Sequence, residues 1–68
     1  MDIKLLVGKR VKELRNNLGF SQEELADLAG LDRTYSTSVE CGRRNISNMN
    51  IEKLAAALKV TLSEFFNF

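Results

Sequence analysis

Apolar residues recur every three or four positions along much of this chain, which is the period of an amphipathic helix. The first such stripe predicts a helix over about residues 2–18 and consists of Ile3, Val7, Val11, Leu14 and Leu18. A later stripe predicts a helix over about residues 48–58 and consists of Ile51, Leu54, Ala55 and Leu58. No segment alternates between apolar and polar residues as a strand would. We therefore expect an all-α fold.

Helix-capping residues divide the rest of the chain. Ser21 and Thr61 each precede a glutamate by three positions, which is the capping-box spacing, and Ser47 repeats the cap without the glutamate. An apolar residue before each cap can pack one turn into the helix, in the pairs Phe20 with Leu25, Ile46 with Ile51 and Val60 with Phe65. Glycines stand where helices should end, at Gly19, Gly30 and Gly42. The further expected helices cover residues 22–29, 33–41 and 62–67, and the whole chain, 1–68, forms one compact five-helix bundle.

One helix start departs from this pattern. Asp32 suits the cap of helix 33–41, but Ser36 stands where the residue that packs on Leu31 should be apolar. A buried hydroxyl in place of an aliphatic side chain typically costs about 2–4 kcal/mol, unless it bonds to a carbonyl one turn earlier. We favour a locally weakened helix over a functional hydroxyl.

The link between helices 22–29 and 33–41 is very short and contains Gly30. Such a link sets two short helices at a steep angle, which is the helix-turn-helix arrangement, here over residues 22–41. It also occurs in purely structural bundles, so the spacing alone does not establish DNA binding. In a major groove, the second helix would present Arg33, Thr34 and Tyr35, with Thr37 next, to the base edges.

Composition narrows the possible chemistry. A chain of 68 residues with 44% hydrophobic content makes one small domain. Because it has no histidine and a single cysteine, Cys41, it lacks an internal disulfide and a His-dependent catalytic triad, and a zinc site is disfavoured. We expect no metal, no cofactor, no small-molecule ligand and no enzymatic activity. An enzyme based on paired carboxylates is the remaining catalytic alternative.

No stretch of the sequence approaches the roughly 20 apolar residues of a membrane span, and the start MDIKLLVGKR lacks the apolar region of a signal peptide. We expect a cytoplasmic protein with no membrane partner. The net charge is only +1, but residues 21–32 carry four acids and no base, and residues 33–50 carry three arginines and one acid. Arg43, Arg44 and Asn45 could grip phosphates, although an arginine pair alone more often keeps a loop soluble.

The runs SQEELADLAGLDRTY, GRRNIS and IEKLAAALKVTLSEFF bring these features together. From about Val7 to Phe66, the chain resembles the phage-repressor or Xre type of helix-turn-helix protein, and most closely the controller proteins of restriction–modification systems. The resemblance implies a lambda-repressor-like DNA-binding domain that acts as a homodimeric transcription regulator on inverted repeats in double-stranded DNA. It implies base contacts by Arg33, Thr34, Thr37 and Arg44. It implies contacts to the phosphate backbone by Ser21, Gln22, Tyr35, Arg43 and Asn45.

Two positions depart from the family pattern. Family members usually have an aliphatic residue where this chain has Ser36, and many have a basic residue where it has Cys41. If that basic residue touches phosphate in the relatives, its absence here would make binding less sensitive to salt. The slope of the logarithm of the binding constant against the logarithm of the salt concentration would fall in magnitude by about one.

Three aromatic residues lie within the last four positions, Phe65, Phe66 and Phe68. One of them, Phe65, could enter the core, and a packed C-terminal plug of all three is an alternative. We favour a two-fold dimer interface built by residues 48–68 and assigned to these three rings. It would place two copies of helix 33–41 about 34 Å apart, one turn of DNA.

Two other regulators on the same fold remain possible from the sequence. One is an antitoxin-type protein that acts mainly by binding a partner protein. The other is a phage-type repressor, which differs from a controller protein in its genomic neighbourhood rather than in its chemistry.

Overall fold

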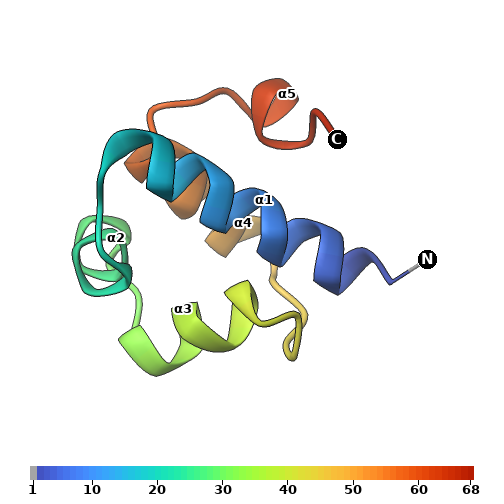
Figure 1. Ribbon diagram of the computed structural model, residues 1–68, viewed down its shortest axis with the longest axis horizontal. Helices are drawn as coiled ribbons and strands as arrows, with labels where there is room; N and C mark the ends of the chain where they lie inside the picture. The colour runs from blue at the N-terminus through green and yellow to red at the C-terminus, as the bar shows by residue number, and fades with distance from the viewer. Residues whose placement is uncertain (1) are drawn as a thin grey trace.

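The computed structural model describes residues 2–68 and is built of helices and short connections. The helices are α1 (Ile3–Leu18), α2 (Gln22–Ala29), α3 (Arg33–Glu40), α4 (Asn48–Ala57) and α5 (Leu62–Phe65), and no strand occurs among the described residues. Figure 1 shows α1 across the middle of the molecule in front of α4, with α3 below them and α5 above. The predicted all-α, five-helix fold is confirmed.

The expected caps form as the sequence predicts. The hydroxyl oxygens of Ser21, Ser47 and Thr61 accept hydrogen bonds from backbone N–H groups three residues later, at 3.0, 3.2 and 3.1 Å. The carboxylates of Glu24 and Glu64 in turn accept hydrogen bonds from the backbone N–H groups of Ser21 and Thr61, so both capping boxes are complete. Each pair satisfies two backbone N–H groups that a helix start leaves without partners.

The helix ends are less well predicted than the starts. α3 and α4 each end one residue before the expected position, and α5 ends at Phe65 instead of residue 67. The N–H of Asn67 bonds to the carbonyl of Glu64, only three residues earlier, at 3.2 Å. This tighter turn ends the helix after four residues.

The core lies where α1, α2, α4 and α5 meet. Its fully buried side chains include Val11, Leu25, Leu54 and Phe65, with Val39 contributed by α3. At Gly8, α1 approaches the end of α3 so closely that a Cβ would overlap the carbonyl oxygens of Val39 and Glu40. Position 8 therefore has room only for glycine, and the end of α3 lies directly against α1. Among the described residues, no helix combines the length and apolar character needed to cross a membrane.

Candidate nucleic-acid interface

The turn between α2 and α3 sets the position of the expected recognition helix. Gly30 adopts the left-handed conformation (φ 69°) that ends α2, and Leu31 packs against the core. The Asp32 carboxylate then accepts hydrogen bonds from the N–H groups of Thr34 and Tyr35, at 2.8 and 3.3 Å. The link therefore anchors one residue in the core and caps the next helix, so α3 starts at a fixed place on the surface.

The first turn of α3 presents two of the predicted base-reading residues to solvent. Arg33 and Thr34 are exposed. The Arg33 guanidinium lies 3.5 Å from the Glu23 carboxylate of α2, and both side chains are 67% exposed. An exposed ion pair of this length is weak and screened by salt, so the guanidinium is free to exchange Glu23 for another acceptor.

Thr37 lies one turn further along α3 and is only half-buried. Its hydroxyl donates to the side-chain oxygen of Gln22 at 3.4 Å, and the Gln22 amide nitrogen lies 3.4 Å from the Glu40 carboxylate. Gln22 thus joins the start of α2 to α3. Ser21, beside it, is exposed but already uses its hydroxyl oxygen as the cap of α2.

Tyr35 connects α3 to the loop that follows it and to α4. Its hydroxyl accepts a hydrogen bond from the Asn50 side chain at 3.0 Å. The guanidinium carbon of Arg44 lies 5.2 Å from the centre of the Tyr35 ring, within the range of a cation–π contact. Asn50 was missed as a site residue in the sequence analysis, although its place at the position of the missing capping-box glutamate was visible there.

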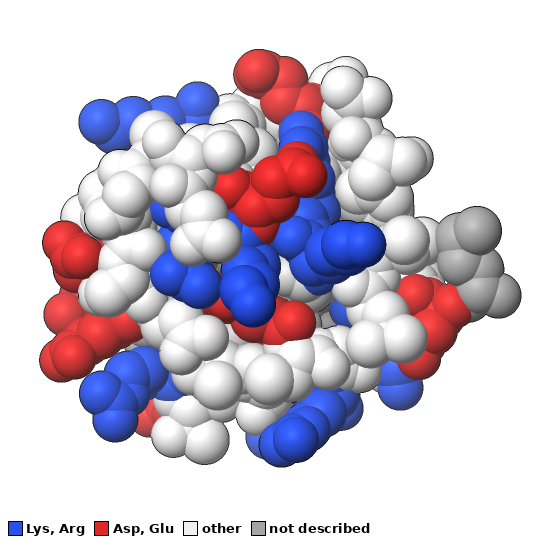
Figure 2. All heavy atoms as spheres, viewed as in Figure 1, with Lys and Arg blue, Asp and Glu red and all other residues white. Residues whose placement is uncertain are grey.

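The loop after α3 carries the remaining predicted contacts. Gly42 turns the chain in the left-handed region (φ 73°), and a Cβ there would overlap the Leu5 side chain of α1. Arg43, Arg44 and Asn45 follow and are all exposed. In Figure 2, Lys and Arg side chains lie along the lower edge, where Figure 1 places α3 and this loop, and acidic side chains gather at the left, over α2.

A buried ion pair lies beneath the surface formed by α3 and the loop after it. Arg15 of α1 holds the Glu40 carboxylate with two guanidinium nitrogens, at 2.9 and 3.0 Å, and donates a third bond to the carbonyl of Phe20 at 2.8 Å. The pair neutralises a carboxylate close to the expected phosphate contacts. This ion pair was not predicted from the sequence, although Arg15 stands four residues after Val11 and hence on the apolar face of α1.

Ser36 faces inward from α3 and is only 1% exposed. Its hydroxyl oxygen has no hydrogen-bond partner among the described residues. As placed, this side chain cannot reach a ligand outside the protein. The structure supports the interpretation of Ser36 as a local weakness of the helix rather than as a functional hydroxyl.

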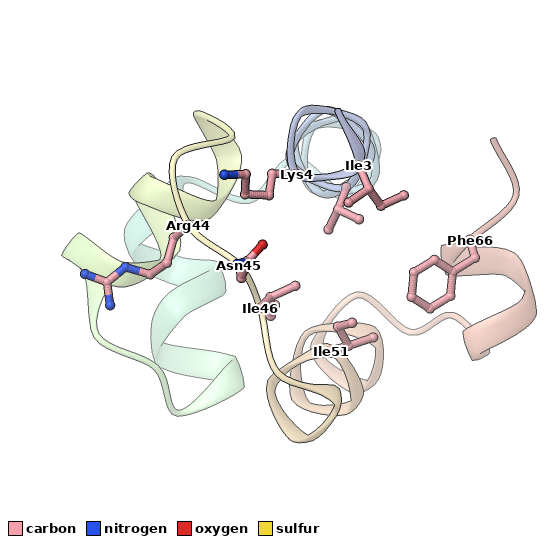
Figure 3. A pocket seen from close by; sticks show the side chains of 8 residues that line it. Ile3, Lys4, Arg44, Asn45, Ile46, Ile51 and Phe66 are labelled. Atoms are coloured by element: carbon pink, nitrogen blue, oxygen red, sulfur yellow. The ribbon is translucent and has the colours of Figure 1, made fainter. Parts of the chain in front are cut away.

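The structure divides the three aromatic rings of the C-terminus. Phe65 has no exposed surface, so its assignment to a dimer interface is wrong, because the ring already lies wholly inside the core of its own chain. Phe66 and Phe68 remain 43% and 54% exposed. Phe66 also borders a cleft of about 140 Å³. Figure 3 shows Ile3, Ile46, Ile51 and Phe66 around this space, with the Arg44 guanidinium directed away from it.

Comparisons with known proteins agree with this geometry. Residues 11–65 match the model of the helix-turn-helix family. The chain is 48% identical over 67 residues to the control protein C.MunI of a Mycoplasma species, covering 97% of this chain and 90% of the relative. It is similar to the crystal structure of the restriction-modification controller protein C.AhdI from Aeromonas hydrophila, with a TM-score of 0.93 and 48% identity, covering 97% of this chain and 100% of that chain.

A third relative was solved with DNA. The C.Esp1396I controller protein, in a tetramer complexed with its natural 35-base-pair operator, matches with a TM-score of 0.90 and 32% identity, covering 97% of this chain and 87% of that chain. The resemblance inferred from the sequence motifs is confirmed. The chain therefore belongs to the helix-turn-helix family of DNA-binding regulators, and its relatives include restriction-modification controller proteins.

Proposed function

We propose that this protein is a sequence-specific transcription regulator that binds an inverted-repeat operator as a homodimer, in the manner of a restriction–modification controller protein. One observation carries the proposal: α3 begins with the exposed Arg33 and Thr34 and is followed by an exposed loop of Arg43, Arg44 and Asn45. Arg44 of this loop reaches back to the ring of Tyr35 in the first turn of α3. Such a surface offers hydrogen-bond donors for base edges beside cationic groups for phosphates. The protein would act in the cytoplasm, on the DNA that carries its operator.

The proposed base contacts are Arg33, Thr34, Thr37 and Arg44. The fork of the Arg33 guanidinium suits the two major-groove acceptors of guanine, and a threonine can offer either its hydroxyl or its methyl group to a base. Thr37 would first have to give up its 3.4 Å hydrogen bond to Gln22, which is long enough to exchange easily. Arg44 would be steered by its contact with the Tyr35 ring.

The proposed phosphate contacts are Ser21, Gln22, Tyr35, Arg43 and Asn45. Ser21 and Gln22 lie at the start of α2, where backbone N–H groups and the positive end of the helix dipole favour an anion. Arg43 and Asn45 are exposed beside α3. The Tyr35 hydroxyl, which accepts from Asn50, keeps its own proton to donate to a phosphate oxygen.

For the homodimer we propose an apolar surface made of Phe66, Phe68 and the cleft beside them. Two large exposed aromatic rings at one chain end, next to a cleft lined by isoleucines, are typical of a surface that a partner covers. A two-fold pairing there would present two α3 helices to one face of DNA, spaced by about 34 Å.

The test is selection of the purified, folded protein against a randomised duplex library at about 150 mM salt, where non-specific phosphate binding is weak. Recovery of an inverted repeat with half-site centres about 10 base pairs apart is the expected result, because a dimer places its two reading helices one DNA turn apart. Enrichment of a single half-site would contradict the homodimer. Absence of any enriched sequence would contradict the whole proposal and favour an antitoxin-type partner binder.

A further inference from the structure

An arginine of α1 holds the backbone at the end of α5. The Nη2 group of Arg10 donates to the carbonyl oxygen of Glu64 at 2.6 Å, and its Nε donates to the carbonyl oxygen of Phe65 at 3.2 Å. Its remaining guanidinium nitrogen pairs with Glu13, one turn along α1. The side chain is only 15% exposed. Arg10 therefore directs two of its three guanidinium nitrogens at the backbone of the tail.

These bonds supply what α5 cannot supply itself. A helix of four residues is far too short to be stable alone, and its last carbonyl groups have no partners within the helix. The capping box of Thr61 and Glu64 secures only the start of α5. At its end, the Arg10 guanidinium donates to the Phe65 carbonyl and adds a second donor to the Glu64 carbonyl, which also accepts from the N–H of Asn67. It also places a positive charge at the negative end of the helix.

The exposed rings follow directly after this contact. Phe65 is anchored in the core, and the Phe66 ring packs edge-on against it, with ring centres 5.0 Å apart. The Phe68 ring lies 6.2 Å from that of Phe66 and lines a groove together with Arg10 and Leu6. The direction in which both exposed rings point therefore depends on the backbone that Arg10 holds.

We infer that Arg10 is a positioning residue for the homodimer: it fixes the C-terminal tail on α1 so that both copies present Phe66 and Phe68 in the same arrangement. The inference rests on the proposed homodimer. An isologous interface needs identical geometry in its two halves, so a loose tail would have to be ordered each time a dimer forms.

The experiment measures the dimer dissociation constant of the full chain by sedimentation equilibrium. Three variants are compared with the unchanged protein: Arg10→Met, Arg10→Lys and the control Lys12→Met. Lys12 is exposed on the same helix and its replacement removes the same charge. We expect Arg10→Met to raise the constant about tenfold or more, Arg10→Lys to give a smaller rise because one ammonium cannot hold both carbonyls in the same way, and Lys12→Met to leave it unchanged.

Two further readouts separate positioning from general stability. Circular dichroism at the same concentrations should show Arg10→Met folded, and its affinity for a single half-site duplex should equal that of Lys12→Met. If a folded Arg10→Met dimerises like Lys12→Met, the inference is wrong. If Arg10→Met does not fold, Arg10→Lys decides, and an unchanged dissociation constant in that folded variant overturns the inference. Wild-type protein that stays monomeric at every concentration would overturn the homodimer itself, and this role of Arg10 with it.

Discussion

At the scale of single residues, Ser36 is the position where this chain is least well matched to its fold. Its hydroxyl is buried and has no hydrogen-bond partner among residues 2–68, whereas the other buried polar side chain, Arg15, is paired with Glu40. Leaving a buried hydroxyl unsatisfied typically costs about 1–3 kcal/mol. We therefore predict that Ser36→Ala raises the free energy of unfolding by about 1 kcal/mol, because the cost is removed and little contact is lost. Urea unfolding followed by circular dichroism measures it.

Ser63 provides the matched control for that prediction, because its hydroxyl is exposed on α5. Ser63→Ala should change the free energy of unfolding by less than about 0.5 kcal/mol. A loss of stability in Ser36→Ala would mean that the hydroxyl is hydrogen-bonded in the native protein. This weakness was predictable from the sequence. The other capped helix starts pair an apolar residue before the cap with one a turn later, and Ser36 breaks that pattern opposite Leu31.

At the scale of elements, α3 and the loop after it should divide the work of DNA binding. The Arg33 side chain projects from the first turn of α3, whereas Arg43 lies in the loop. We predict that Arg33→Ala weakens binding to the operator by about 1–3 kcal/mol and leaves binding to random duplex nearly unchanged, because a base contact is lost. Arg43→Ala is the matched variant and should weaken both duplexes alike, lowering the salt slope by about one.

Fluorescence anisotropy titrations of both duplexes at several salt concentrations separate these outcomes. An equal loss on operator and random duplex for Arg33→Ala would show that Arg33 holds the backbone rather than reads bases. A loss confined to the operator for Arg43→Ala would assign base reading to the loop. Either result would reverse the proposed division between the helix and the loop.

The local elements of this fold were predictable from the sequence, and the contacts between elements were not. Caps and apolar stripes depend on residues within about four positions of each other, so the starts of α2, α4 and α5 could be predicted from spacing. The ion pair of Arg15 with Glu40 joins residues that are 25 positions apart. Its formation depends on how α1 packs against α3, where the two backbones come close at Gly8, and this packing has no periodic signature in the sequence.

The same limit applies to the site. The sequence identified Arg33, Thr34 and the loop arginines by their residue types next to a helix-turn-helix spacing. It did not predict that Asn50 of α4 bonds to the Tyr35 hydroxyl, or that Arg44 lies over the Tyr35 ring. Both contacts depend on where α4 and the loop before it lie relative to α3. The burial of Phe65 was expected from its place one turn after Val60, but the exposed position of Phe66 beside the cleft was not predicted by the sequence.

At the scale of the whole molecule, a chain of 68 residues can form only a small hydrophobic core. A domain of this size buries only about 60% of the surface that its unfolded chain exposes, while Phe66 and Phe68 remain largely outside the core. A dimer that covers these rings would therefore add stability that depends on protein concentration. We predict that the melting temperature rises by roughly 2–5 °C for each tenfold increase in protein concentration.

Melting followed by circular dichroism over a hundredfold range of concentration tests this, with Phe66→Ser and Leu28→Ser compared with the unchanged protein. Both residues are exposed apolar side chains, but Leu28 lies on α2, away from the tail. Phe66→Ser should melt at a temperature independent of concentration, because the apolar surface for pairing is disrupted, whereas Leu28→Ser should keep the dependence. If the melting temperature of the unchanged protein is the same at every concentration, the monomer is stably folded without a partner. In that case the exposed rings do not serve self-association, and binding of an inverted repeat would require the DNA to bring the two copies together.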